Sequence, residues 1–104
     1  MGILQNVARI WEVAMTVYMV ERDLKGISMD ALGQAQKAAI AKAQAMTSAG
    51  TDVRYIRSTF APGDGRCMCL FEAKSAEDVK RLNDDCGLPY SKVVEALDLT
   101  PPAA

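Results

Sequence analysis

The feature that most constrains this chain is a dense turn signal at residues 62–65, where the sequence reads Pro-Gly-Asp-Gly. Proline, glycine and aspartate in succession favour a reversal of the backbone. The runs on either side, VRYIRSTFA at 53–61 and RCMCLFEA at 66–73, are rich in the β-branched, aromatic and aliphatic residues of strands. The sequence therefore predicts a β-hairpin closed by a short loop, and the rest of the fold must be built around it.

Two further strands are predicted, one on each side of the hairpin. Residues 15–21 (MTVYMVE) and 91–99 (SKVVEALDL) have strand composition. Helical segments at 29–49 and 76–86 separate these strands from the hairpin. The order β-α-β-β-α-β predicts an α+β, ferredoxin-like fold. Right-handed crossovers place both helices on one face of a four-stranded antiparallel sheet.

Both helical segments carry start and stop signals. Ser28 and Ser75 are preferred N-cap residues, and Gly50 and Gly87 follow the two segments as glycine commonly follows a helix. In the longer segment we expect one buried stripe, formed by Leu32, Ala35, Ala39, Ala43 and Met46, and one solvated face, formed by Gln36, Lys37, Lys42 and Gln44.

The first residues of the chain predict a short amphipathic helix at 3–14. We therefore divide the chain into an N-terminal extension at 1–14, a ferredoxin-like domain at 15–100 and a tail at 101–104. The extension is expected to pack on its own domain or on a sister subunit, and alternatives are a partner protein or a membrane surface. Its helical spacing is carried by Ile3, Leu4, Val7, Ile10 and Trp11.

Composition excludes several classes of function. Twelve basic and thirteen acidic residues leave a net charge of −1, so no basic field is available to hold nucleic acid. No apolar run approaches the roughly 20 residues of a membrane span. The chain has no histidine, so a hydrolase triad cannot be built, and we assign no catalytic residues. Three cysteines, an odd number without framework spacing, favour a reducing compartment, which we expect to be the cytoplasm.

Pairing across the turn assigns the faces of the hairpin. Phe60 is expected opposite Cys67, Ser58 opposite Cys69, and residue 56 opposite residue 71. One face is then apolar, and we assign it to the helices and the core. Its members are Ile56, Phe60, Cys67, Cys69 and Phe71.

The other face of the sheet has no helix of its own. If Val17 and Met19 point inward, Tyr18 and Val20 lie on this open face, although a shift of one residue reverses the assignment. An apolar surface of this size favours a homodimer in which two sheets meet. Arg57, if buried there, would need Glu72 or Glu95 as its partner. The hairpin contributes Tyr55, Arg57, Thr59, Met68, Leu70 and Glu72, and the last strand contributes either Val93, Glu95 and Leu97 or Val94, Ala96 and Asp98.

Three separated stretches carry a family resemblance. The sequences YMVERDL at 18–24, VRYIRSTFAPGDGRCMCLFEA at 53–73 and KVVEALDL at 92–99 resemble the small bacterial nickel-binding protein family. The resemblance runs from about residue 18 to residue 101, and the N-terminal segment looks like an addition to it. It implies a ferredoxin-like fold, a homodimer and nickel binding.

Metal binding without histidine would depend on thiols and carboxylates. Nickel(II) accepts thiolate and carboxylate ligands, so Cys67 and Cys69 could chelate one ion. A harder ion could be held at a strand end by the carboxylates of Glu21, Asp23, Glu72 and Glu95. The alternatives are that the two cysteines are ordinary core residues or redox groups, and that the carboxylates are solvated or ion-paired.

Three functions stay open from the sequence. The first is a small soluble protein that binds nickel or a similar divalent ion as a homodimer. The second is a dimeric α/β-barrel that binds a small molecule, or acts on it as an enzyme, in a cavity between the sheets. The third is an assembly or adaptor protein that uses residues 3–14. Side chains available for the second are Tyr18, Tyr55, Arg57, Glu72 and Glu95.

Overall fold

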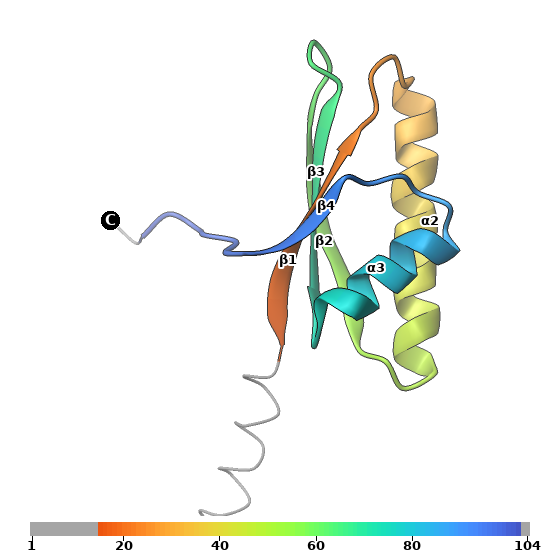
Figure 1. The fold of residues 1–104 in the computed structure, drawn as a ribbon, viewed down its shortest axis with the longest axis vertical. Coiled ribbons are helices and arrows are strands. Elements are labelled where there is room, and N and C mark those ends of the chain that lie inside the picture. The colour runs from red at the N-terminus through yellow and green to blue at the C-terminus, as the bar shows by residue number, and fades with distance from the viewer. Residues whose placement is uncertain (1–14, 103–104) are drawn as a thin grey trace, which may run out of the picture.

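The computed structural model describes residues 15–102, so the helix predicted at 3–14 lies outside the described residues. Within them the fold is α+β, with a four-stranded antiparallel sheet and both helices on one side of it (Figure 1). The order β-α-β-β-α-β agrees with the prediction. The elements are β1 (Thr16–Asp23), α2 (Met29–Ser48), β2 (Val53–Ala61), β3 (Arg66–Ala73), α3 (Ala76–Asp85) and β4 (Lys92–Ala96).

The hairpin pairs as predicted near its turn and differently at its far end. The sheet order is β2-β3-β1-β4, and Phe60 pairs with Cys67 as expected. A register shift between Tyr55 and Arg57 adds one residue to β2. Tyr55, rather than Ile56, therefore pairs with Phe71, and the prediction that Ile56 faces Phe71 is wrong. The cause is a β-bulge, which turns Tyr55 toward the helices.

The first strand presents the opposite face from the one we favoured. Tyr18, Val20 and Arg22 are 7%, 0% and 4% exposed and lie under the helices. Val17 and Met19 alternate with them and point to the open face. The prediction of Tyr18 and Val20 on the open face is therefore wrong, because the strand is shifted by one residue.

The last strand settles the alternative that the sequence left open. Val93 pairs with Val20 and packs against the core, so Val94 points to the open face. Glu95 pairs with Tyr18 and shares the face of Val93. The set that begins with Val94 is therefore the correct one. Beyond Ala96 the chain leaves the sheet on the side opposite the helices (Figure 1).

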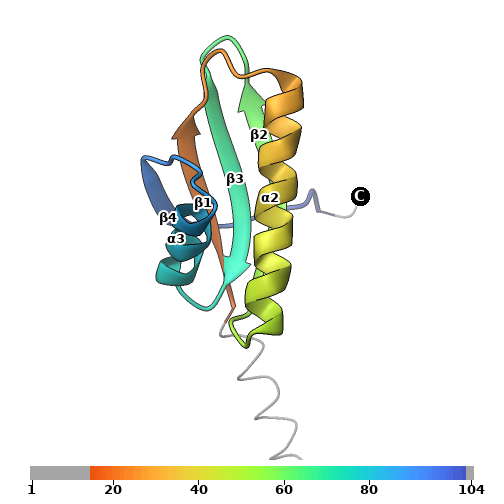
Figure 2. The same cartoon turned by 90° about the vertical axis from the view of Figure 1, so that its right-hand side faces the viewer.

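The helix signals are confirmed by contacts. The Ser28 hydroxyl accepts from the amide of Ala31 at 3.0 Å, and the Ser75 hydroxyl accepts from the amide of Asp78 at 3.2 Å. Small alanines allow α2 to approach the sheet closely, and α2 lies along β2 while α3 lies nearer β4 (Figure 2). The buried stripe of α2 is Leu32, Ala39, Ala43 and Met46.

The tip of the hairpin holds the connection between β1 and α2. Gly65 has a φ of +77°, and a Cβ there would approach the Cα of Lys25 to 2.5 Å. Its carbonyl accepts from the amide of Leu24 at 2.7 Å. Only glycine fits this position. The contact fixes Leu24, whose carbonyl in turn accepts from the amide of Ile27, and both residues line the cavity described next.

Candidate functional site

A cavity of about 130 Å³, partly open to solvent, lies between α2 and the helix-covered face of the sheet. Leu24, Ile27, Leu32 and Leu88 form its aliphatic walls. The strands contribute polar and sulfur-containing side chains to the lining, because residues two apart on a strand point to the same face. These contributions are Arg22 from β1, Tyr55 and Ser58 from β2, and Cys67 and Cys69 from β3.

Two thiols meet at the wall of this cavity. The sulfur atoms of Cys67 and Cys69 lie 3.8 Å apart, and their residues are 0% and 7% exposed. Both cysteines are free. The prediction that they lie under the helices is confirmed. Two soft donors at this separation, facing the cavity, form the most chemically distinctive group in the described residues.

A chain of hydrogen bonds leads to the thiol pair. Ser58 Oγ donates to Cys69 Sγ at 2.9 Å, and the oxygens of Ser58 and Tyr55 lie 2.6 Å apart. A hydroxyl has one proton to donate, so Tyr55 must donate to Ser58. Gln36 Nε2 in turn donates to the Tyr55 oxygen at 2.9 Å. The chain runs from Gln36 through Tyr55 and Ser58 to Cys69, and it fixes the orientation of that sulfur.

A buried guanidinium stands next to the thiols. Arg22 pairs with Cys67 across β1 and β3. Its Nη1 donates to the Pro89 carbonyl at 3.1 Å, and its Nη2 donates to Asn83 Oδ1 at 2.9 Å. Asn83 is itself held by a bond to the Val79 carbonyl at 2.8 Å. Among the ion pairs found in residues 15–102, none involves Arg22, so neutral acceptors hold a buried charge.

The environment keeps the Cys67 thiol protonated at neutral pH. Burial raises the pKa of Cys67 to about 11, and the neighbouring Cys69 acts in the same direction. The Arg22 guanidinium opposes both by favouring the thiolate. Burial also raises the pKa of Cys86, the C-cap residue of α3. Its thiol donates to the Ala38 carbonyl at 3.6 Å and does not line the cavity.

The carboxylates proposed as metal ligands do not join the thiols. Glu21 lies on the open face of β1 and accepts from Arg66 at 3.2 Å. Asp23 is exposed and accepts from the amide of Lys25 at 3.0 Å. The sheet stands between Glu21 and the cysteines. Across the described part of the chain, no three cysteine or carboxylate side chains gather in the way a metal site requires.

The residues proposed to line a cavity between two sheets lie on different faces of the sheet. Tyr18 and Tyr55 lie on the helix side, and so the prediction that Tyr55 faces outward is wrong. Arg57 pairs with Asp98 at 2.9 Å rather than with Glu72 or Glu95. The bulge accounts for Tyr55, and the segment after β4 supplies the unexpected carboxylate.

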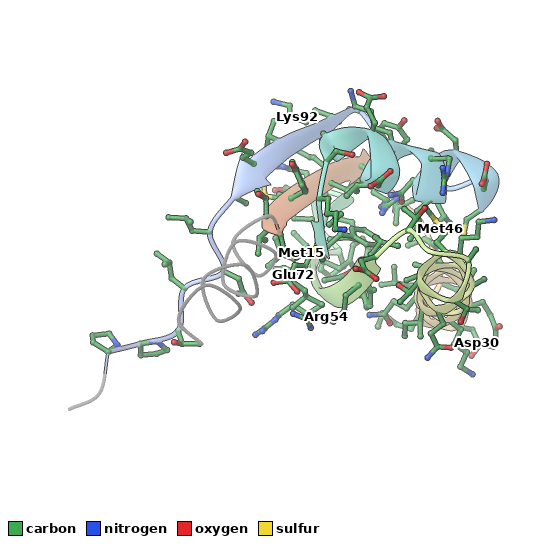
Figure 3. All side chains as sticks on the ribbon, turned by 90° about the horizontal axis from the view of Figure 1, so that it is seen from below. Met15, Asp30, Met46, Arg54, Glu72 and Lys92 are labelled. Carbon is green, nitrogen blue, oxygen red and sulfur yellow. The ribbon has the colours of Figure 1, made fainter. Side chains whose placement is uncertain are left out.

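The open face combines apolar side chains with exposed ion pairs. Arg54 and Glu72 lie together on this side, whereas Met46 lies on the helix side of the sheet (Figure 3). Leu97 and Leu99, in the segment after β4, are 80% and 79% exposed. The half-buried or exposed apolar residues of the face are Val17, Met19, Met68, Leu70 and Val94.

Three residues that line the cavity or hold its lining were not found from the sequence. Gln36 was expected on the solvated face of α2, and Asn83 and Arg22 were not singled out. For Arg22 a signal exists, since it continues the alternation of Tyr18 and Val20. A charged residue in that position indicates the solvent-exposed end of a strand, unless the groups that accept its hydrogen bonds are known. Those acceptors come from distant parts of the chain, Asn83 and Pro89.

Comparisons with known proteins agree on one family. The family model described as nickel responsive protein SCO4226-like matches residues 18–96. The crystal structure of SCO4226 from Streptomyces coelicolor A3(2) is similar with a TM-score of 0.68 and 27% identity, over 82% of this chain and 99% of that one. None of the curated proteins compared matches. In residues 15–102 no helix is long and apolar enough to cross a membrane. The chain belongs to the family of nickel responsive proteins like SCO4226.

Proposed function

We propose that this protein binds nickel or a similar thiophilic divalent ion through Cys67 and Cys69, and that it acts as a homodimer. The observation that carries the metal site is the pair of sulfurs 3.8 Å apart at the wall of the cavity. The family is named for its response to nickel, which supports the choice of ion.

The separation of the sulfurs suits one shared ion. Two sulfurs, each about 2.3 Å from an ion at tetrahedral angles, stand about 3.8 Å apart. The strand therefore holds both donors near their chelating distance, and little rearrangement is needed. Ser58 donates to one sulfur, which is the role of a group that orients a ligand without binding the ion.

Two thiols are half of a four-coordinate site. Glu21 and Asp23 are held elsewhere, so the remaining positions fall to small groups within the cavity, water above all. The cavity of about 130 Å³ has room for an ion with water molecules. Such a site binds and releases an ion more readily than a closed four-cysteine site, as suits sensing or buffering.

Binding is coupled to proton release. Because the pKa of Cys67 is about 11, an ion must displace the thiol proton at neutral pH. Affinity is therefore expected to rise with pH. The site also requires reduced cysteines, so this function belongs to a reducing compartment such as the cytoplasm.

Nickel titration of the purified full chain tests the metal site. We expect sulfur-to-nickel charge-transfer absorption that saturates, and we expect Cys69→Ser and the double variant Cys67→Ser/Cys69→Ser to lose it. Cys86→Ser is the matched control and should keep it, because Cys86 lies outside the cavity lining. Circular dichroism verifies that each variant is folded.

Two outcomes would contradict the thiol site. One is unchanged nickel affinity in the folded double cysteine variant. The other is loss of nickel binding in Glu21→Gln or Asp23→Asn with the cysteines intact, which would move the ion to the strand end. Absence of binding in the reduced wild-type chain would remove the metal function itself.

The homodimer is argued from the open face, which lies on the other side of the sheet from the thiols. Val17, Met19, Met68 and Leu70 are only half-buried in one chain, and Val94 is 39% exposed. A second sheet placed on this face would bury them together, as in the ferredoxin-like dimers implied by the sequence resemblance. The metal site and the interface are thus separate and can fail separately.

Solution mass tests the homodimer. Light scattering of the wild-type chain should give twice the chain mass, and Leu70→Asp should give the mass of one chain. Gln34→Asp, on the exposed surface of α2, is the control and should remain dimeric. A wild-type chain that stays monomeric at all concentrations would refute the homodimer while leaving the thiol site untouched.

A further inference from the structure

A second hollow, separate from the thiol cavity, runs between the C-terminal half of α2 and the beginning of β2. It is an open groove of about 510 Å³. Ile40 stands in it with 41% of its surface exposed, the only aliphatic side chain larger than alanine on the described outer surface of this half of α2. The side chains that give the groove its apolar character are Met15, Ile40, Ala43, Val53 and Tyr55.

The groove lies on an unpaired side of the sheet. β2 is an edge strand in the order β2-β3-β1-β4, so one side of its backbone has no neighbouring strand within the described residues. Proteins commonly cover such an edge with a helix or loop. An apolar groove beside an open edge therefore favours an occupant that lies along α2 and covers both.

The chain enters the described structure at this groove. Met15 is one of its lining residues. Thr16 and Val53 both pair with Ala73, from opposite sides of β3, so they stand two strand spacings or about 10 Å apart. Whatever precedes Met15 therefore starts beside the groove, and no long connection is needed to reach it.

The preceding residues have the right length and pattern. Residues 3–14 lie outside the described residues, and their sequence predicts one apolar helical stripe. A helix of that length measures about 18 Å, and the lining part of α2, from Ile40 to Ser48, measures about 12 Å. The family match begins at residue 18, so this segment is a feature of the chain outside the matched region.

We propose that residues 3–14 pack into the groove between α2 and β2 of their own chain. The stripe that contains Val7, Ile10 and Trp11 covers Ile40 and the start of the β2 edge. The groove shares Tyr55 with the thiol cavity and Arg54 with the open face, but it contains neither the two thiols nor the apolar residues of the open face, so the three proposals are tested on different side chains.

Trp11 provides a direct test, because it is the single tryptophan of the chain. In the full wild-type chain we expect blue-shifted Trp11 emission and weak quenching by acrylamide. Ile40→Asp should shift the emission to the red and restore strong quenching, because the charge cannot be buried under the stripe. Ala41→Asp is the matched control: it adds the same charge at the adjacent exposed position and should leave Trp11 protected.

A second variant approaches the contact from the other side. Val7→Asp should release Trp11 without touching the described fold, as judged by far-ultraviolet circular dichroism. A wild-type Trp11 as accessible as free tryptophan would overturn the proposal, as would protection that Ile40→Asp and Val7→Asp leave intact. Protection that is lost on dilution would also overturn it by assigning the contact to another chain, whereas protection that persists at concentrations where scattering gives a monomer supports packing within one chain.

Discussion

The two faces of the sheet are built from the same strands, but the side chains of one face are buried under the helices and those of the other are only half-buried. In β3, Cys67, Cys69 and Phe71 point to the helices and are almost wholly buried. Met68 and Leu70, their immediate neighbours, point to the open face and stay half-buried. The two helices cover one face of the sheet, whereas no part of residues 15–102 covers the apolar side chains of the open face. The alternation of the strand thus places the thiols and their hydrogen bonds on one side of the sheet and the surface of the proposed dimer on the other.

Polar groups follow the same division. On the helix face, Arg22, Asn83 and Tyr55 are held by specific hydrogen bonds, and residues 15–102 contain no buried side-chain nitrogen or oxygen without a partner. On the open face, charges form ion pairs that water can reach, such as Arg54 with Glu72 at 3.3 Å. Buried polar groups are costly to disturb and exposed pairs are not. Four predictions test this contrast, from the largest effect to the smallest.

Truncating two neighbouring side chains of β3 should lower the free energy of unfolding by very different amounts. Phe71 is fully buried and meets the Tyr55 ring edge to face, with centroids 5.4 Å apart. Phe71→Ala should lower the free energy of unfolding by about 3–5 kcal/mol, measured by urea denaturation. Leu70→Ala, on the open face, should lower the free energy of unfolding of the monomer by less than Phe71→Ala does. Equal losses at concentrations where the chain is monomeric would show that the open face is also a closed core.

Removing a buried guanidinium should lower the free energy of unfolding more than removing an exposed one. Arg22→Met keeps much of the side-chain volume but leaves Asn83 Oδ1 and the Pro89 carbonyl without their donor. We expect the free energy of unfolding to fall by about 1–3 kcal/mol. Arg54→Met removes an exposed partner of Glu72 and should cost about 0–1 kcal/mol. A stabilised Arg22→Met would mean that desolvation of the charge outweighs its two hydrogen bonds.

Local signals predicted the order of elements and the site of the thiols. Serine caps, the turn at 62–65 and strand composition depend on neighbours in sequence, and Ser28 and Ser75 cap as expected. Pairing counted back from the turn placed Cys67 and Cys69 correctly, because the register near a tight turn is fixed by the turn itself.

Features that depend on distant contacts were not predictable. The bulge before Arg57 has no clear local signature, and it moved Tyr55 to the helix face. The inward face of β1 ends in Arg22, which reads as a surface residue until its acceptors more than 60 positions away are known. The chain of hydrogen bonds from Gln36 to Cys69 depends on both events, so the environment of the thiols could not be derived from sequence.

High pH should weaken the helix face through Cys67. Its pKa is raised from 9.0 to about 11 in the fold, so between these values the unfolded chain has released a proton that the folded chain still holds. The free energy of unfolding should therefore decrease as pH rises above about 9. Urea denaturation at a series of pH values should show a shallower decrease in Cys67→Ala. Cys86→Ala is the control, because it keeps the same titrating lysines and tyrosines, and its free energy of unfolding should decrease with pH more steeply than that of Cys67→Ala. If Cys67→Ala shows the same pH dependence as the wild type, Cys67 is not the group responsible.

The smallest effect is expected at the ion pair that ties the C-terminal segment to β2. Arg57 and Asp98 lie 2.9 Å apart, but the arginine side chain is 60% exposed. Asp98→Asn should lower the free energy of unfolding by about 0.2–1 kcal/mol at low salt, and the difference should shrink as salt screens the pair. If a second sheet covers this face, the pair is desolvated at the interface, and the same substitution should also lower the apparent stability in a concentration-dependent way. A salt-independent loss that does not vary with protein concentration would place Asp98 in a structural role within one chain.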